Sequence, residues 1–104
     1  MQTEYEIYLD YQRSIGRADG LLVISSKVAS RIQSEITSCR NQLAGGWTGN
    51  SAGDFLLKLN SLEEKGKNLA QRIAQIAEMQ KTVAWNIYEA ELNALAIARQ
   101  RENG

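Results

Sequence analysis

The sequence predicts an all-α fold: an antiparallel two-helix hairpin that we expect to pair into a four-helix bundle. First, the 104 residues include no proline, the residue that most disrupts a helix interior. Second, two long stretches repeat apolar residues at alternating spacings of three and four, which is typical of helices with one apolar stripe. Third, a glycine-rich segment separates the two stretches, so they can fold back on each other within a single domain over residues 1–104.

The first helix is expected over about residues 3–43. Its stripe, which we expect to form one side of the hairpin seam, includes Ile15, Leu22, Ile32, Ile36 and Leu43. A break near Gly16–Gly20 is the alternative, because Asp19-Gly20 is a turn signal and glycine weakens a helix interior. Since the stripe keeps its phase through this region, we favour a continuous or slightly bent helix.

The turn is expected over about residues 44–53, which contain four of the eight glycines. Gly45 or Gly46 could supply the left-handed residue that ends the first helix, and Ser51 with Asp54 resembles a capping box.

The second helix is expected over about residues 54–100. Its side of the seam includes Phe55, Leu59, Leu62, Leu69, Ile73, Ile76, Val83 and Ile87. Setting Leu43 opposite Phe55 keeps both stripes in register and places Ile32 opposite Gly66, a large residue against a small one.

Charge and composition exclude several classes of function. Twelve basic residues balance twelve acidic ones, so the chain lacks the positive charge typical of binding to nucleic acid or anionic membranes. With no histidine and only Cys39, the common catalytic triads and zinc sites lack a necessary residue. We therefore expect no enzyme activity, metal or cofactor. The sequence also shows no apolar run long enough for a membrane span or signal peptide.

Apolar residues outside the seam indicate a binding partner, because two helices alone cannot cover them. The candidate interface residues are Leu21, Ile24, Val28, Leu56, Trp85, Tyr88 and Leu92. The predicted register also brings Tyr8 and Tyr11 near Trp85 and Tyr88, so we expect an aromatic cluster at the open end of the hairpin. That cluster could simply fill the core or could serve as a docking patch.

Trp47 is unusual, since a large apolar side chain in an interhelical turn must cover or bind something. The residues Trp47-Thr48-Gly49, midway along a proline-free chain of about one hundred residues with Phe55 eight positions later, resemble the WXG-hundred family. These small, early-secreted-antigen-like proteins are substrates of type VII secretion.

The resemblance implies a non-enzymatic protein that leaves the cytoplasm without a cleaved signal peptide and becomes secreted or cell-surface. It implies export by a complex with an FtsK-like ATPase, in which Trp47 and Gly49 contribute to the export signal. The implied partner is a second copy, a related helical hairpin, or an LXG-type effector whose secretion the chain supports. The resemblance leaves the choice between homodimer and heterodimer open.

One element of the family pattern is missing. Many members carry Tyr-x-x-x-Asp/Glu after the second helix, whereas Tyr88 is followed four positions later by Leu92. Either this part of the signal is absent from the chain or a partner supplies it. The alternative function is a cytosolic helical secretion chaperone or coiled-coil adaptor, which would share the exposed apolar faces but remain in the cell.

Overall fold

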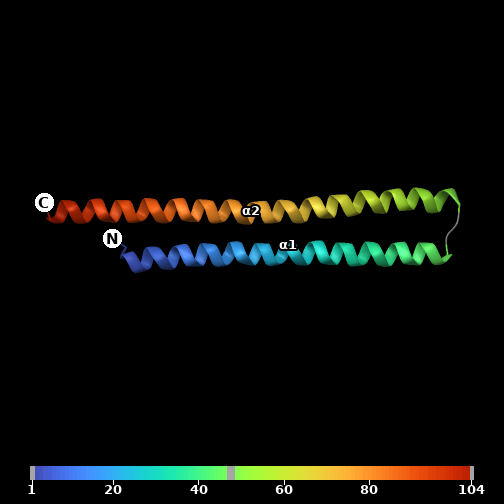
Figure 1. The fold of residues 1–104 in the computed structure, drawn as a ribbon, viewed down its shortest axis with the longest axis horizontal. Helices are drawn as coiled ribbons and strands as arrows, with labels where there is room; N and C mark the ends of the chain where they lie inside the picture. The colour runs from blue at the N-terminus through green and yellow to red at the C-terminus, as the bar shows by residue number, and fades with distance from the viewer. Residues whose placement is uncertain (1, 47–48, 104) are drawn as a thin grey trace. The chain divides into compact units, whose positions relative to one another are not determined.

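The protein is an all-α helical hairpin, as the sequence predicts. The computed structural model describes residues 2–46 and 49–103, and these contain two helices and no strand. Helix α1 covers Glu4–Gly46 and helix α2 covers Asn50–Asn103, with 43 and 54 residues (Figure 1). Neither helix contains a stretch long and apolar enough to cross a membrane.

Helix α1 begins with a side-chain cap. The backbone N–H of Glu6 donates to the Thr3 hydroxyl at 3.2 Å, and that hydroxyl in turn donates to the Glu6 carboxylate at 3.2 Å. The Ile7 N–H donates to the Thr3 carbonyl, which marks Thr3 as the N-cap residue. Glu4 and Glu6 also place negative charge on the first turn, where the helix dipole favours it.

The connection between the helices is shorter than the predicted turn over residues 44–53. Helix α1 continues through Gly46, so neither Gly45 nor Gly46 ends it in a left-handed conformation. Among the described residues only Gly49 has a positive φ, at 96°, a value that glycine adopts without a steric penalty. The predicted turn is too long because Ala44, Gly45 and Gly46 belong to α1 and residues 50–53 belong to α2.

Helix α2 begins before the predicted capping box. The Gly53 N–H donates to the Gly49 carbonyl at 3.3 Å, so Gly49 occupies the N-cap position and Asn50 is the first helical residue. Ser51 therefore lies inside the first turn and Asp54 just after it, and the prediction that they open the helix is wrong. At the other end, α2 runs to Asn103, a little beyond the predicted end near residue 100.

Helix α1 passes through Gly16 and Gly20 without a break, as the phase of its stripe indicates. The chain divides into two compact units, each built from a segment of both helices. The first unit combines Met1–Leu21 with Gln75–Gly104, and the second is Leu22–Ala74. We call these the terminal unit and the central unit.

The core of the central unit is a small apolar cluster next to a close helix contact. Ile36, Leu43 and Leu59 are buried together, and Ile32 and Cys39 pack against them. Further along, the Ser25 hydroxyl donates to the Ala70 carbonyl on the other helix at 2.6 Å. Such a bond requires the two helices to approach closely, which small residues on both sides allow.

The terminal unit is also built around small residues. Its buried apolar residues are Ile7, Ala18, Ala77, Ala84 and Leu95. Polar contacts join the helices beside this line: the Gln80 side-chain amide donates to the Ser14 carbonyl at 3.4 Å, and the Lys81 ammonium lies 2.8 Å from the Asp19 carboxylate. The helices of this unit therefore pack through alanines with polar contacts at the margin.

The predicted seam on α2 is wrong for most of its members. Leu59 is buried and Ile73 is half-buried, but the other predicted seam residues are between 40% and 57% exposed: Phe55, Leu62, Leu69, Ile76, Val83 and Ile87. After Leu69, Ile76 and Val83, α2 instead turns the next residue toward α1, which is Ala70, Ala77 and Ala84 in turn. Gly66, which the predicted register sets opposite Ile32, is also buried and lies against Ile32.

The physical reason for this shift is that small residues let two helix backbones approach more closely than leucine and isoleucine do. One residue corresponds to about 100° of rotation around a helix, which moves the large side chains from the contact line to its flank. On α1, by contrast, none of the predicted seam residues is exposed. Ile36 and Leu43 are buried, and Ile15, Leu22 and Ile32 are half-buried.

Candidate partner-binding surface

The shift on α2 creates an apolar surface that the hairpin does not cover. In the central unit, Leu62 and Leu69 are more than half exposed; in the terminal unit, so are Ile76 and Val83. These four residues follow one another at intervals of seven, which keeps them on one side of the helix in each unit. Regularly spaced exposed residues of this size are typical of a helix that packs against another helix.

In the central unit this surface contains a groove of about 440 Å³. Its apolar lining is Ile32, Ile36, Leu62, Gly66 and Leu69. Gly66 leaves room for the groove and for Ile32, whose methyl carbons lie 2.7 Å from the point where a Cβ on residue 66 would stand. The charged side chains of Arg31, Glu35 and Lys65 line the rim. The groove is thus an apolar trough with charges of both signs beside it.

The terminal unit contains an aromatic cluster of three of the four predicted residues, Tyr11, Trp85 and Tyr88, whereas Tyr8 is 45% exposed and forms no ring contact with them. Tyr11 stacks on Tyr88 with 4.8 Å between ring centroids, and the Trp85 ring lies edge-on to Tyr11 at 5.8 Å. Trp85 and Tyr88 are themselves 5.6 Å apart. The cluster packs the two helices together, but Trp85 is still 46% exposed.

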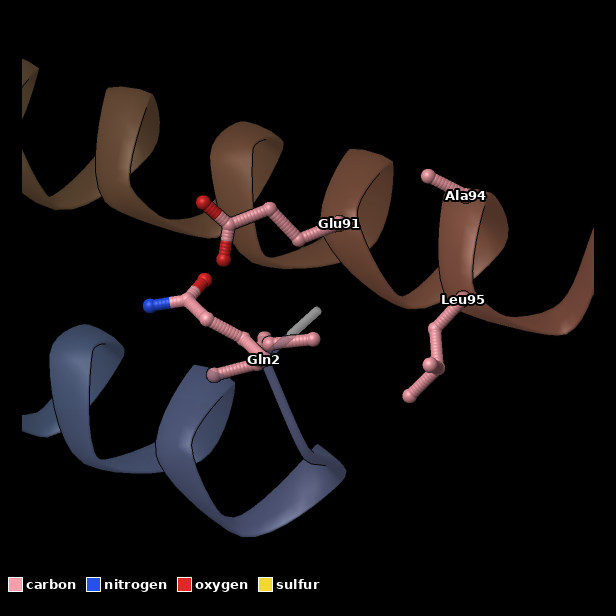
Figure 2. Close-up of a pocket in the computed structure, with 5 residues that line it drawn as sticks. Gln2, Glu91, Ala94 and Leu95 are labelled. Atoms are coloured by element: carbon pink, nitrogen blue, oxygen red, sulfur yellow. The ribbon is translucent and has the colours of Figure 1, made fainter. Parts of the chain in front are cut away.

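The terminal unit has a hollow of its own, which lies where the first residues of the chain meet the last third of α2. It has a volume of about 190 Å³ and is lined by Gln2, Ile7, Glu91, Ala94 and Leu95. In Figure 2 the polar ends of Gln2 and Glu91 face each other, while Leu95 extends from α2 away from them. With one carboxylate and one amide beside aliphatic walls, the hollow offers no set of groups for acid–base catalysis.

The predicted interface residues fall into two groups. Ile24, Leu56 and Trp85 are exposed, with 38% to 49% of their surface accessible. The other four are half-buried within the hairpin: Leu21, Val28, Tyr88 and Leu92. The side chains of the first group are therefore available to a partner. Those of the second group are partly covered by contacts within the chain.

Ion pairs join the two helices within each unit. In the central unit, the Arg40 guanidinium donates to both carboxylate oxygens of Glu63, at 3.1 and 3.2 Å, and also to the Asn60 amide oxygen. This hydrogen-bonded arginine lowers the pKa of Glu63. In the terminal unit, the hydrogen bond to Asp19 raises the pKa of Lys81. Both shifts favour the charged forms that hold the helices together.

The two residues of the predicted export signal are placed differently. Gly49 is exposed, and its positive φ explains why a glycine is required at that position. Trp47 lies outside the described residues. The position of the motif along the chain is nevertheless defined, because α1 ends at Gly46 and α2 begins at Asn50.

The alanine line of α2 is the feature that our sequence interpretation missed. Its signal is present in the sequence, since Ala70, Ala77 and Ala84 recur at intervals of seven, one position after the large residues. Giving weight to small residues as contact positions would have found it. In the part of the chain that is described, no three side chains of metal-ligating type converge.

Comparison with family models, curated proteins and solved structures gives no match for this chain.

Proposed function

We propose that this chain is a small, non-enzymatic type VII secretion protein of the WXG kind, exported as a dimer with a second copy, a related hairpin or an LXG-type effector. The observation that carries the proposal is the position of Trp47-Thr48-Gly49. These three residues are all that lies between two helices of 43 and 54 residues. A motif that occupies the whole interhelical connection is well placed for recognition by other proteins.

The conformation of Gly49 supports a specific role for the motif. Its φ of 96° restricts the position to glycine, and its carbonyl is the first acceptor of α2. The glycine of the motif therefore fixes where α2 begins.

The exposed apolar side chains support export as part of a dimer. Isolated surface leucines are common, but in the central unit Leu62 and Leu69 flank a groove with an apolar lining. Covering such a surface with the apolar face of a second hairpin would give a four-helix bundle. A protein of this size gains much of its buried apolar area from such pairing.

The test is to compare export of the Trp47→Ala and Thr48→Ala variants in the native host. We expect Trp47→Ala to lower the amount in the medium several-fold and Thr48→Ala to leave it unchanged, because only the first removes a side chain of the motif. Circular dichroism should show equal helical content in both variants, since residues 47–48 lie outside both helices. Unchanged export of Trp47→Ala would contradict the proposal.

A second function has one observation in its favour. Tyr88 and Leu92 are both half-buried in the hairpin, and no acidic residue stands four positions after Tyr88. An export signal that needs Tyr-x-x-x-Asp/Glu is therefore incomplete in this chain. This observation favours a cytosolic secretion chaperone or coiled-coil adaptor, which would use the same apolar surface but would not leave the cell.

A further inference from the structure

Two hollows of the central unit adjoin each other on α2. One is the apolar groove of about 440 Å³. The other, which we call the donor hollow, has a volume of about 240 Å³ and is lined by Lys65, Asn68, Leu69 and Arg72. Lys65 and Leu69 line both, so the two hollows lie side by side. An apolar groove of this volume next to a few polar groups is typical of a site for a small molecule.

The donor hollow has the groups that bind an anion. It combines an ammonium, a guanidinium and a side-chain amide, and its lining contains no carboxylate. Lys65, Asn68 and Arg72 are spaced three and four residues apart, which keeps them on one side of α2, and all three are exposed. Neither cation forms an ion pair inside the described ranges 2–46 and 49–103. Both are therefore free to bind a negatively charged group.

The central unit as a whole is basic, although the chain has no net charge. Its residues 22–74 include seven of the twelve basic residues and four of the twelve acidic ones, which gives a net charge of +3. The ion pair between Arg40 and Glu63 uses one residue of each sign and leaves this excess unchanged. The potential around the central unit therefore attracts anions.

The charges beside the groove are separated along its length. Ile32 contacts Gly66, so Glu35, three residues further along α1, lies near the level of residue 63 on the antiparallel α2. Arg72 is nine residues beyond that level, or about 14 Å along the helix. The carboxylate on the rim of the groove and the end of the donor hollow at Arg72 therefore stand far apart. One end of this surface is suited to an anionic group and the other is not.

We propose that the central unit binds a free fatty acid, with the acyl chain in the groove and the carboxylate in the donor hollow. The acyl chain lies along Leu62 and Leu69, where Gly66 leaves the floor of the groove without a side chain. The carboxylate accepts hydrogen bonds from Lys65 and Arg72, and such charge-assisted bonds are stronger than neutral ones. A ligand with one apolar chain and one anionic end matches both hollows at once.

This inference goes beyond the proposed function, which assigns the groove to another protein and names no small molecule. A fatty acid and a partner chain would compete for the groove, because both cover Leu62 and Leu69. Occupation by the fatty acid would then leave the hairpin unpaired. Binding of the fatty acid does not require export, so the two proposals can fail separately.

The first test compares ligands that differ in one part at a time, by isothermal titration calorimetry on the purified native chain. Dodecanoate should bind saturably, with one molecule per chain, below the concentration at which it forms micelles. Dodecyltrimethylammonium keeps the apolar chain but reverses the charge, and butanoate keeps the carboxylate but lacks most of the chain. We expect both to bind at least about tenfold more weakly. No saturable binding of dodecanoate, or equal binding of the ammonium compound, would overturn the inference.

The second test locates the carboxylate. Lys65→Gln/Arg72→Gln should weaken binding of dodecanoate on the order of tenfold, because it removes both charged donors of the hollow. Lys27→Gln/Lys58→Gln is the matched control, since it removes the same charge from exposed positions of the central unit outside both hollows, and its affinity should stay within about twofold of the native value. Equal losses in the two variants would show that only net charge matters and would contradict the site.

The third test locates the acyl chain. Leu62→Ser removes an apolar wall of the groove and should weaken binding several-fold, whereas Leu57→Ser, at a position that is 68% exposed and lines neither hollow, should leave it unchanged. Circular dichroism should show equal helical content in all variants, because the substituted side chains are exposed. Equal affinities for Leu62→Ser and Leu57→Ser would contradict the groove as the site.

Flotation with phosphatidylglycerol vesicles separates a free fatty acid from a membrane surface. We expect the chain to remain unbound to the vesicles. A chain that floats with them and binds no dodecanoate would overturn the inference. A chain that binds dodecanoate but is never exported would contradict the proposed function alone, and an exported chain that binds no dodecanoate would contradict this inference alone.

Discussion

At the scale of a single residue, Gly66 determines how closely α1 and α2 approach in the central unit. A Cβ at this position would stand 2.7 Å from both Cδ1 and Cγ2 of Ile32, well inside normal contact distance. The terminal methyl group of Ile32 can move, but Cγ2 is attached directly to Cβ and follows the backbone. Gly66 is therefore a close-packing residue rather than a flexible point in α2.

This contact predicts opposite effects for glycine-to-alanine changes at different positions. Gly66→Ala should lower the free energy of unfolding by about 1–2 kcal/mol, because overpacking outweighs the gain in helix propensity. Gly16→Ala is the matched control: nothing lies within 4 Å of its added Cβ, so it should raise stability by about 0.5–1 kcal/mol. Urea denaturation of both variants measures the difference.

The double variant Gly66→Ala/Ile32→Ala tests the cause of the loss. Removing the isoleucine methyl groups frees the space that the new Cβ needs, so in the Ile32→Ala background the Gly66 substitution should become neutral or stabilising. If Gly66→Ala is destabilising by the same amount in both backgrounds, the contact with Ile32 is not the reason.

At the scale of the helices, the sequence predicts the elements well and the orientation of α2 poorly. The absence of proline and the three–four periodicity predict two long helices, and Gly16 and Gly20 do not interrupt the first. The periodicity, however, marks any helix face that is apolar, whether it meets the other helix or a separate molecule. On α2 the largest residues form one stripe and the alanines form the adjacent one, and we chose the stripe with the larger residues.

The same ambiguity explains what could be predicted of the candidate surface. Leu62 and Leu69 are prominent in the sequence, but their role reverses from hairpin seam to exposed groove wall once α2 is rotated by one residue. The predicted register already places Ile32 opposite Gly66, as in the structure, but it does not place the Ser25 hydroxyl on the Ala70 carbonyl. That side-chain-to-backbone contact is a property of three-dimensional packing and leaves only a weak trace in residue types.

The ion pair between α1 and α2 makes the stability of the hairpin depend on pH. Arg40 lowers the pKa of Glu63 in the folded state, so the unfolded chain binds a proton there at higher pH than the folded one. The stabilisation is complete above the ordinary glutamate pKa of about 4.3 and is lost as the pH falls through the lower folded value. We expect thermal unfolding of Glu63→Gln to depend less steeply on pH below about 5 than that of the native chain.

The control for this measurement is Glu64→Gln, the exposed neighbour, whose carboxylate forms no ion pair in the described part of the chain. Its unfolding profile should follow that of the native chain over the same range. Parallel profiles for Glu63→Gln and the native chain would show that the contact with Arg40 adds no pH-dependent stability.

At the scale of the whole molecule, the chain has two features to which the proposed function assigns contact with other proteins. One is the apolar side of α2 with its groove in the central unit, and the other is the Trp47-Thr48-Gly49 connection. Neither offers converging acid–base or metal-binding groups among the described residues, and both are suited to contact with proteins. We expect the apolar side of α2 to bind a second chain and the connection to be recognised during export.

The most direct test of the proposed export is the release of the native, untagged chain into culture medium in hosts with and without the FtsK-like ATPase, with a cytosolic marker to correct for lysis. We predict release that depends on the ATPase and falls to the level of the marker in its absence. Retention in the cytosol, or release that is the same in both strains, would contradict the proposed function. Retention would favour the chaperone or adaptor function, with Trp47 as a residue of the connection alone.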